Sequence, residues 1–205
     1  MQPEQKKFYM REVFQFLFPT VRLNRSLRIL ITLNMTINFV IGIFAPFYAI
    51  FVAKIGGDVA LAGFSWAILG IVSGVLTLFF TRWELRVREQ ELLLALGYVL
   101  RAVVFLSYAF MASMPQLLMT QVLWGIAAAI GVPAFDAIYG AHTSREGSIV
   151  EWGGLEGVSS IATGIAALIG GLVIQEFGFS AVFFGMSAIS FGLALYVWLL
   201  PRDVL

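Results

Sequence analysis

The sequence predicts an all-α membrane protein with six transmembrane helices, because long apolar runs dominate it and charged residues are few. Of its 205 residues, 60% are hydrophobic and 12% are charged, and the mean hydropathy is +0.91. A soluble domain is about 45–50% apolar and about 25% charged, so a water-soluble fold would not hide this much apolar surface. The runs reach the roughly 20 residues that a helix needs to cross the hydrocarbon core, whereas barrel strands have only about 9–11.

The six runs follow one another closely along the chain. They cover Leu30–Ala53, Val59–Phe80, Leu92–Ser113, Gln116–Tyr139, Gly154–Glu176 and Ser180–Leu200. The gaps between them are short and contain Gly, Pro or charged residues, which end helices or prefer water. No segment is left for a soluble domain, so residues 30–200 are expected to form one transmembrane domain.

Lys and Arg residues outside the runs collect on one side of this topology. They precede the first run, follow the second, fourth and sixth, and leave Lys54 alone on the opposite side. The positive-inside rule therefore predicts that both termini are cytoplasmic, and we expect the cell (inner) membrane. Residues 1–29 mix basic and aromatic side chains, which predicts a cytoplasmic amphipathic segment, and residues 201–205 form a cytoplasmic tail.

Composition excludes several classes of function. Cysteine is absent and His142 is the single histidine, so we expect no disulfide and no metal site. The net charge of +1 indicates no nucleic-acid partner. No phosphate-binding Gly-Lys-Ser/Thr motif is present, so we expect no cofactor and no ATP-driven step by this chain alone. The expected partners are the lipid bilayer, a small-molecule substrate and a second copy of the chain.

Two runs carry small residues at 4-3-4-3 spacing, which places each set on one helix face. The second run has Gly63, Ala67, Gly70, Gly74 and Thr77; the fifth has Gly153, Gly157, Ser160, Gly164, Ala167 and Gly171. Small residues let helix backbones approach closely in lipid. Both faces are therefore predicted to pack tightly, either inside one subunit or across a subunit interface.

The fourth and fifth runs carry motifs that resemble those of the major facilitator superfamily. Gly125, Ala127, Ala129 and Pro133 fall on its R-x-x-x-G-x-G-x-G-x-x-x-P-like pattern, with Gln121 in place of the Arg. Gly164 and the pair at 170–171 resemble its glycine-rich fifth helix, although the expected Gly-Pro is absent. The loop at 81–88 keeps the basic residues of the family's loop but lacks its Asp and Gly.

The resemblance implies that this chain is one six-helix half of a twelve-helix transporter. Family transporters have two six-span halves related by an axis along the membrane normal, and the second helix of each half packs on the fifth of the other. We therefore expect a parallel homodimer that moves a small solute by alternating access. The alternative is a non-transporting membrane assembly protein, or one half of a heterodimeric transporter.

Polar residues inside the runs are candidates for solute binding. Arg101 lies near the membrane midplane, where it either binds an anionic group, forms a structural ion pair or snorkels to the interface. Asn34 and Asn38 share one face of the first run. The resemblance implies that they, Gln121 and Trp124 line a central cavity; interhelical hydrogen bonding is the alternative role.

Asp136 and Glu156 are candidates for proton coupling or for a gate ion pair, because each lies near the cytoplasmic end of its run. Glu151 is expected to be solvated at the membrane interface. Tyr48 and Trp66 are expected to be ordinary interfacial aromatic residues.

Intramembrane proteases are an enzyme class to consider, because six-span proteases use a Gly-x-Ser nucleophile. The tripeptides at 63–65 and 185–187 match a Gly-x-Ser nucleophile motif. The predicted topology, however, places Ser65 and Ser187 near the face opposite to His142. A base must lie within hydrogen-bond reach of its nucleophile, so we expect no catalytic residue and no enzyme activity.

Overall fold

The computed structural model describes residues 24–84, 87, 89–144, 147–201 and 204, and all regular structure in these residues is helical. The helices are α2 (Arg25–Phe44), the 3-10 turn η1 (Ala45–Phe47), α3 (Tyr48–Lys54), α4 (Val59–Glu84), α5 (Gln90–Ala109), α6 (Met114–His142) and α7 (Ser148–Leu199). The predicted all-α class is confirmed. Most of the predicted amphipathic segment, up to residue 23, lies outside the described residues, as do Arg86, Arg88 and Arg145.

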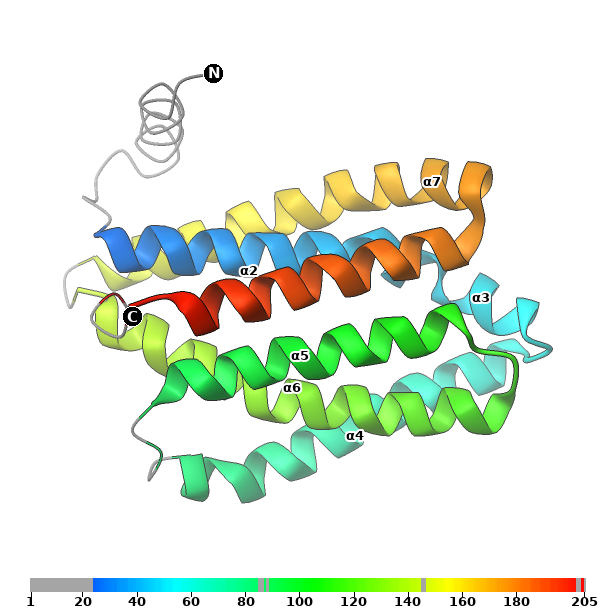
Figure 1. The fold of residues 1–205 in the computed structure, drawn as a ribbon, viewed down its shortest axis with the longest axis horizontal. Helices are drawn as coiled ribbons and strands as arrows, with labels where there is room; N and C mark the ends of the chain where they lie inside the picture. Colours follow the sequence, from blue (N-terminus) through cyan, green and yellow to red (C-terminus); the bar gives the residue numbers. More distant parts are fainter. Residues whose placement is uncertain (1–23, 85–86, 88, 145–146, 202–203, 205) are drawn as a thin grey trace.

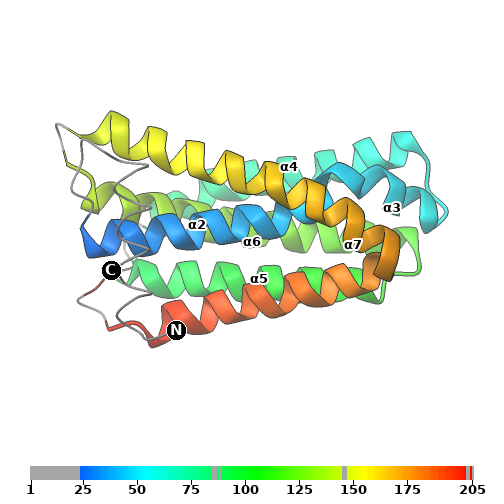
Figure 2. The same cartoon turned by 90° about the horizontal axis from the view of Figure 1, so that it is seen from above.

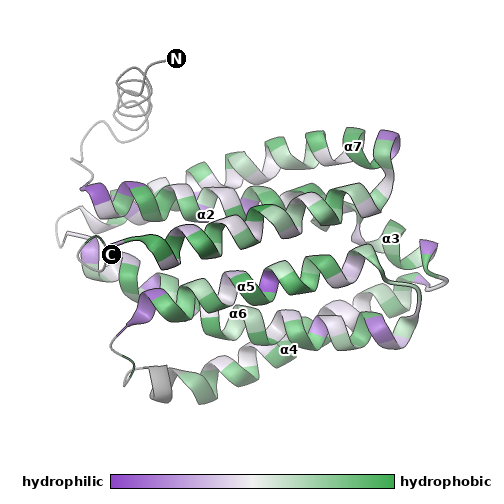
Figure 3. Cartoon of the chain, viewed as in Figure 1, coloured by the Kyte–Doolittle hydropathy of each residue, from purple (hydrophilic) through white to green (hydrophobic). Residues whose placement is uncertain are grey.

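The helices lie side by side in a bundle whose long axis runs along them (Figures 1 and 2). Five helical stretches of the described chain are long and apolar enough to cross a membrane, with Arg25–Lys54 counted as one. Hydrophobic residues cover most of their length, as Figure 3 shows. The bundle thus has the composition and dimensions of a multi-pass membrane protein.

The first predicted span begins earlier than expected and is not one straight helix. The Asn24 side chain accepts a hydrogen bond of 2.7 Å from the Leu27 N–H and so caps α2. Pro46 has no N–H to donate to the helical hydrogen-bond pattern, and α2 gives way there to the 3-10 turn before α3. Gly56, with φ +90°, then ends α3, and the Asp58 carboxylate accepts from the Leu61 N–H at the start of α4.

The last helix, α7, is divided into two arms at Gly178, whose φ of 77° and ψ of 175° are not helical. This residue lies in the predicted gap at 177–179. The 52 residues of α7 would extend about 78 Å as one helix, more than twice the roughly 30 Å of a hydrocarbon core. Figures 1 and 2 show the two arms running in opposite directions from this turn and diverging, with α2 between them.

The start of α2 and the ends of α6 and α7 meet at one end of the bundle. The Ser26 hydroxyl donates to the Val204 carbonyl over 2.7 Å, and the Asn24 amide donates to the His142 carbonyl over 3.3 Å. Both ends of the described chain therefore lie on the same side (Figure 1). An even number of membrane crossings requires this arrangement.

Close helix crossings depend on a few glycines. A methyl group added at Gly97 on α5 would lie 2.7 Å from the Gly131 Cα on α6. One at Gly42 on α2 would lie 2.9 Å from Thr163 on the first arm of α7, and Gly170 lies directly against the Ile43 carbonyl. Such contacts allow backbones to approach without side chains between them, which is how helices in lipid gain packing energy.

Candidate functional site

A buried series of hydrogen bonds, formed by Gln121, Tyr48 and Ser65, joins three helices near the end of the bundle where α3 lies. The Gln121 amide donates to the Tyr48 hydroxyl, which lies 2.6 Å from the Ser65 Oγ. Ser65 in turn donates to the Ala62 carbonyl over 3.0 Å. Gln121 is 0% exposed. Tyr48 is thus not an ordinary interfacial aromatic residue, because it connects α3 to α4 and α6.

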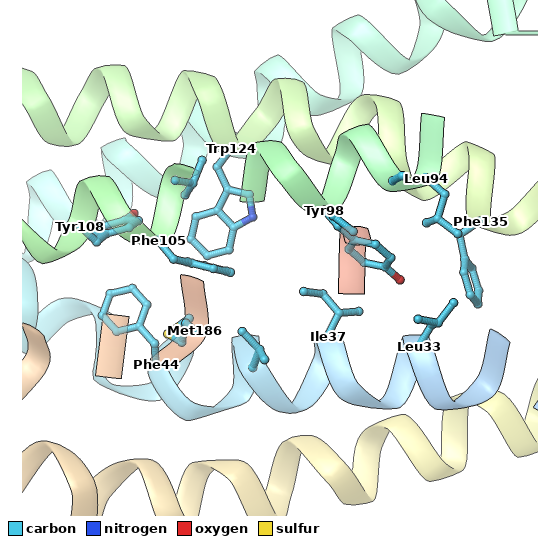
Figure 4. Packing of buried hydrophobic residues seen from close by; sticks show 14 of the residues in the cluster. Leu33, Ile37, Phe44, Leu94, Tyr98, Phe105, Tyr108, Trp124, Phe135 and Met186 are labelled. Atoms are coloured by element: carbon cyan, nitrogen blue, oxygen red, sulfur yellow. The ribbon is translucent and has the colours of Figure 1, made fainter. Parts of the chain in front are cut away.

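Aromatic rings surround these hydrogen-bonded side chains. Trp66 lies edge-on to Tyr48, with ring centroids 5.0 Å apart, and 6.0 Å from Trp124. Trp124 also contacts Phe105 at 5.5 Å and Tyr108 at 6.1 Å. Figure 4 shows Trp124, Phe105 and Tyr108 gathered over the α2 core. Trp66 is 41% exposed, so it alone of these rings connects the cluster to the outer face of α4.

One polar atom of this cluster, the buried Gln121 Oε1, has no hydrogen-bond partner among the described residues. An unsatisfied buried polar atom costs about 1–3 kcal/mol, so such atoms mark positions where a ligand or an ordered water belongs.

Asn34 and Asn38 connect α2 to the first arm of α7. The Asn38 amide donates to the Asn34 Oδ1 over 2.7 Å, and the Ser159 hydroxyl donates to the same oxygen over 2.7 Å. Thr163 donates to the Ser159 carbonyl over 2.9 Å. Both asparagines are half-buried. The Asn34 side chain therefore takes part in an interhelical hydrogen bond, whereas the side chain of Asn38 bonds within α2.

Arg101 lies inside the bundle between α5 and α6 and is 7% exposed. Its guanidinium occupies the space that a side chain at Gly131 would fill, with Nη1 3.1 Å from the position of such a Cβ, and its Cζ lies 5.8 Å from the Tyr98 ring. The Nε has no hydrogen-bond partner, and no acidic side chain in the described part of the chain pairs with it. Among the described residues Arg101 therefore forms no ion pair, and its buried position is not a snorkelled one.

Asp136 on α6 and Glu156 on α7 both lie on the exposed surface of the bundle. Their carboxyl groups are near enough to repel each other. Neither pairs with Arg101, which is buried on the other side of α6. Glu151 was predicted to be solvated, and this was wrong: it is 2% exposed and accepts a hydrogen bond of 2.9 Å from the Ser144 N–H. It thereby closes the loop between α6 and α7.

The two small-residue faces are open. Six of their glycines have nothing within 4 Å of an added methyl group among the described residues: Gly63, Gly70, Gly74, Gly153, Gly157 and Gly164. Ala67 is exposed and Ala167 half-buried. Gly171 differs, since a methyl group there would lie 3.1 Å from the Phe47 ring. Within the described residues, these six glycines therefore pack against no other helix.

An apolar groove of about 420 Å³ lies beside one of the open faces, between α2 and the first arm of α7. Its lining is Met35, Thr36, Phe39, Val158, Ile161, Ala162 and Ile165. Thr36 is the one residue in this set with a polar side chain, and its hydroxyl donates within its own helix to the Thr32 carbonyl. The groove thus offers apolar contact and no charge.

Residues 29–204 match the family model of the Major Facilitator Superfamily. The chain belongs to the major facilitator superfamily. Searches of curated proteins and of solved structures gave no match to it. Members of this superfamily are membrane transporters, which agrees with the apolar helices and with the resemblance in the fourth and fifth runs.

The two serines of the Gly-x-Ser tripeptides form hydrogen bonds that hold neighbouring helices together. The Ser65 hydroxyl is hydrogen-bonded to the Tyr48 hydroxyl, and Ser187 donates to the Ala102 carbonyl over 2.8 Å. His142 ends α6 at the opposite end of the bundle from α3, with its Nδ1 2.9 Å from the Ile138 carbonyl. No nucleophile–base pair forms from these residues.

The sequence analysis found Gln121 and Trp124 but missed Tyr48, Ser65 and Tyr108 as their partners. One available signal was the prolines: Pro46 shifts Tyr48 out of the line of α2 toward α4. The partners are 17 and 73 residues apart along the chain. Such separations cannot be read from local periodicity.

Proposed function

We propose that this superfamily member is a secondary transporter that works as a parallel homodimer, moving a small solute by alternating access along a pathway between the two copies. In this arrangement the two arms of α7 cross the membrane separately, so that each copy contributes six crossings. Two copies then supply the twelve helices that two family halves contain.

The open small-residue faces on α4 and α7 carry this proposal. At an internal crossing, Gly97 and Gly131 lie against each other's backbone, whereas six glycines on these two faces have no described atom within 4 Å of an added methyl group. An open small face wastes packing energy in lipid unless a second helix covers it. The family's packing of second on fifth helices matches α4 and the first arm of α7.

The two faces also fit each other in register. Along α4 the spacing from Gly63 to Thr77 is 4-3-4-3, and along α7 the spacing read backwards from Gly171 to Gly157 is also 4-3-4-3. In Figure 1, α4 and the first arm of α7 run in opposite directions. Parallel copies keep that relation across a two-fold interface, so Gly70 faces Gly164 and Gly74 faces Ser160.

The site residues support a solute pathway beside this interface. Trp66 is next to Ala67 on α4, and its ring contacts Tyr48, which is hydrogen-bonded to the buried Gln121. The apolar groove lies beside the small-residue face of α7. Asp136 and Glu156 lie on the exposed surface, where a proton or a gate contact is accessible to them. The energy source is then an ion gradient or the gradient of the solute itself.

Cysteine cross-linking tests the interface directly, because the chain contains no native cysteine. Gly70→Cys and Gly164→Cys are placed on separately tagged copies and co-expressed. A disulfide needs Cα atoms within about 7 Å, so we expect a covalent dimer carrying both tags. Gly63→Cys with Gly157→Cys is the matched control, since the register separates those levels by 14 residues, about 21 Å.

Equal cross-linking of the matched and mismatched pairs would contradict this register. Absence of any dimer in membranes, combined with solute uptake only when another half-size chain is co-expressed, would favour a heterodimer. Proteoliposome uptake across a solute panel, with the cross-link formed and then reduced, tests alternating access: locking the interface should stop uptake, and reduction should restore it.

A further inference from the structure

A pocket of about 400 Å³ lies at the end of the bundle where α3 is, opposite to the ends of the described chain. Residues within 51–56, 108–112 and 179–180 line it, so it is formed by the end of α3, the end of α5 and the start of the second arm of α7. These three segments meet at the same end of the bundle in Figures 1 and 2. The volume is that of a site for a small molecule.

One wall of this pocket is aromatic and is held by packing. Phe51, Tyr108 and Phe179 line the pocket and are all buried. The Phe51 ring centroid lies 5.5 Å from that of Tyr108 and 5.3 Å from that of Phe179. The Tyr108 hydroxyl is hydrogen-bonded to Tyr48, so its polar atom is already used. The wall therefore offers apolar contact, and the protein core holds it in place before a ligand binds.

Lys54 is the one charged side chain among the described residues that line this pocket. Its Nζ lies over the Phe179 ring, 5.6 Å from the centroid, and its side chain is exposed. No acidic side chain of the described residues pairs with it. The contact with the ring holds the ammonium group beside the aromatic wall and leaves its N–H donors available to an anion.

Lys54 also determines which charge the pocket favours. The helix ends around the pocket oppose one another, because α3 and α5 end there with partial negative charge, whereas the second arm of α7 begins there with partial positive charge. Asp58 and Glu176, the described acids nearest along the chain, do not line the pocket. Ser180 lines it, is exposed and adds a hydroxyl that can donate a hydrogen bond. The pocket therefore favours an anion.

We propose that this pocket binds the anionic head, a carboxylate or a phosphate, of a small amphipathic molecule. Lys54 and Ser180 contact the head, and the apolar body lies against the aromatic wall. A water-borne acid and the headgroup of an anionic lipid offer the same chemistry, because a bundle end lies at the membrane surface. The pocket uses none of the residues of the dimer interface proposed above, and its test measures binding alone.

Three probes of one shape and different charge test the pocket in the purified full-length protein, held in an uncharged detergent. Benzoate is an anion, benzamide is neutral and benzamidinium is a cation, and each has a phenyl ring and a planar head. Saturation-transfer NMR detects weak binding of each probe, and micelles without protein give the blank. We expect saturable binding of benzoate, about 2- to 5-fold tighter than that of benzamide, which is the range of an exposed ion pair. Benzamidinium should not bind.

Variants then assign the binding to this pocket. Lys54→Gln removes the charge and should weaken benzoate binding by the same factor without changing that of benzamide, whereas Lys54→Arg should retain it. Arg25→Gln removes a positive charge from an exposed position at the opposite end and is the matched control. Ala112→Trp fills the pocket from an exposed position and should abolish benzoate binding. Ala141→Trp adds the same bulk at an exposed position of α6 outside the pocket and should not.

Added lipids distinguish the two sources of the anion. The benzoate titration is repeated in micelles that contain phosphatidylglycerol, which is anionic, or phosphatidylcholine, which has no net charge. Loss of benzoate binding with phosphatidylglycerol alone supports the proposal with a lipid headgroup as the ligand. Binding retained in both supports it with a water-borne acid.

Other results would overturn the proposal. If benzoate shows no saturable binding above the blank, or binds no more tightly than benzamide, the pocket does not select an anion. If Lys54→Gln binds benzoate as the parent does, the lysine is not the group that holds the head. If Ala112→Trp does so, the probe lies outside this pocket. Lys54 and Ala112 are both exposed, so neither change disturbs the packed core.

Discussion

Adding one methyl group at Gly97 tests whether this glycine lies at a tight helix crossing, where a side chain does not fit, or faces outward, where it does. The Cβ of Gly97→Ala would lie 2.7 Å from the Gly131 Cα and 3.2 Å from the Gly131 nitrogen, both backbone atoms. Backbone cannot rotate away as a side chain can, so α5 and α6 must move apart. Overpacking of this kind costs about 1–3 kcal/mol.

Gly192→Ala is the matched comparison, because Gly192 is also inside a helix but has nothing within 4 Å of an added methyl group in the described structure. Both changes gain the same helix propensity, about 0.5–1 kcal/mol. The difference between the two variants therefore isolates the contact. At about 2–4 °C per kcal/mol, apparent melting temperatures in detergent should differ by about 2–12 °C, with Gly97→Ala lower. Equal melting temperatures would refute the assignment of Gly97 to a tight crossing.

Three further predictions concern polar residues of the long helices. Arg101→Met should be at least as stable to heat as the parent, because it removes a buried charge that no described acid neutralises; a lower melting temperature would show that Arg101 has stabilising partners. Asn34→Leu should lower the melting temperature by a few degrees, since it loses an interhelical hydrogen bond from Ser159, a kind that averages about 0.6 kcal/mol, and one from Asn38 within α2. Asp136→Asn should abolish uptake driven by a pH gradient while solute exchange at equal pH continues, as measured in proteoliposomes; unchanged pH-driven uptake would remove its proposed proton role.

Hydropathy predicts where the helices lie because membrane-length apolar runs have few other uses. The gap predicted at 177–179 contains Gly178, the residue at which α7 turns, and α4 begins at the predicted Val59. The ends are less predictable. α6 runs to His142, beyond the predicted Tyr139, because polar residues that suit the interface continue the helix at no cost.

The rotation of each helix about its axis is what the sequence leaves undetermined. Gly97 and Gly70 are both glycines inside apolar runs, yet Gly97 meets Gly131 whereas Gly70 meets none of the described residues. Their difference depends on which face each helix turns to its neighbours, and a membrane helix that is apolar all round carries little amphipathic signal. The 4-3-4-3 spacing showed that a face exists, and only the fold shows that it is open.

Lipid changes how exposed surface must be interpreted. Large apolar side chains such as Leu78 and Phe79 on α4 are strongly exposed, but lipid tails accept them as well as a protein core would, so they indicate no partner. Small residues are different, because lipid packs poorly against an empty groove and another helix packs well. The argument for a second copy therefore depends on Gly70 and Gly164 and not on hydrophobic exposure. It follows that replacing exposed Leu78 by Ala should leave dimers intact, whereas Gly70→Leu should separate them without preventing membrane insertion. Single-molecule counting of labelled copies in native membranes distinguishes these two results, and dimers that persist after Gly70→Leu and Gly164→Leu together would remove the interface from consideration.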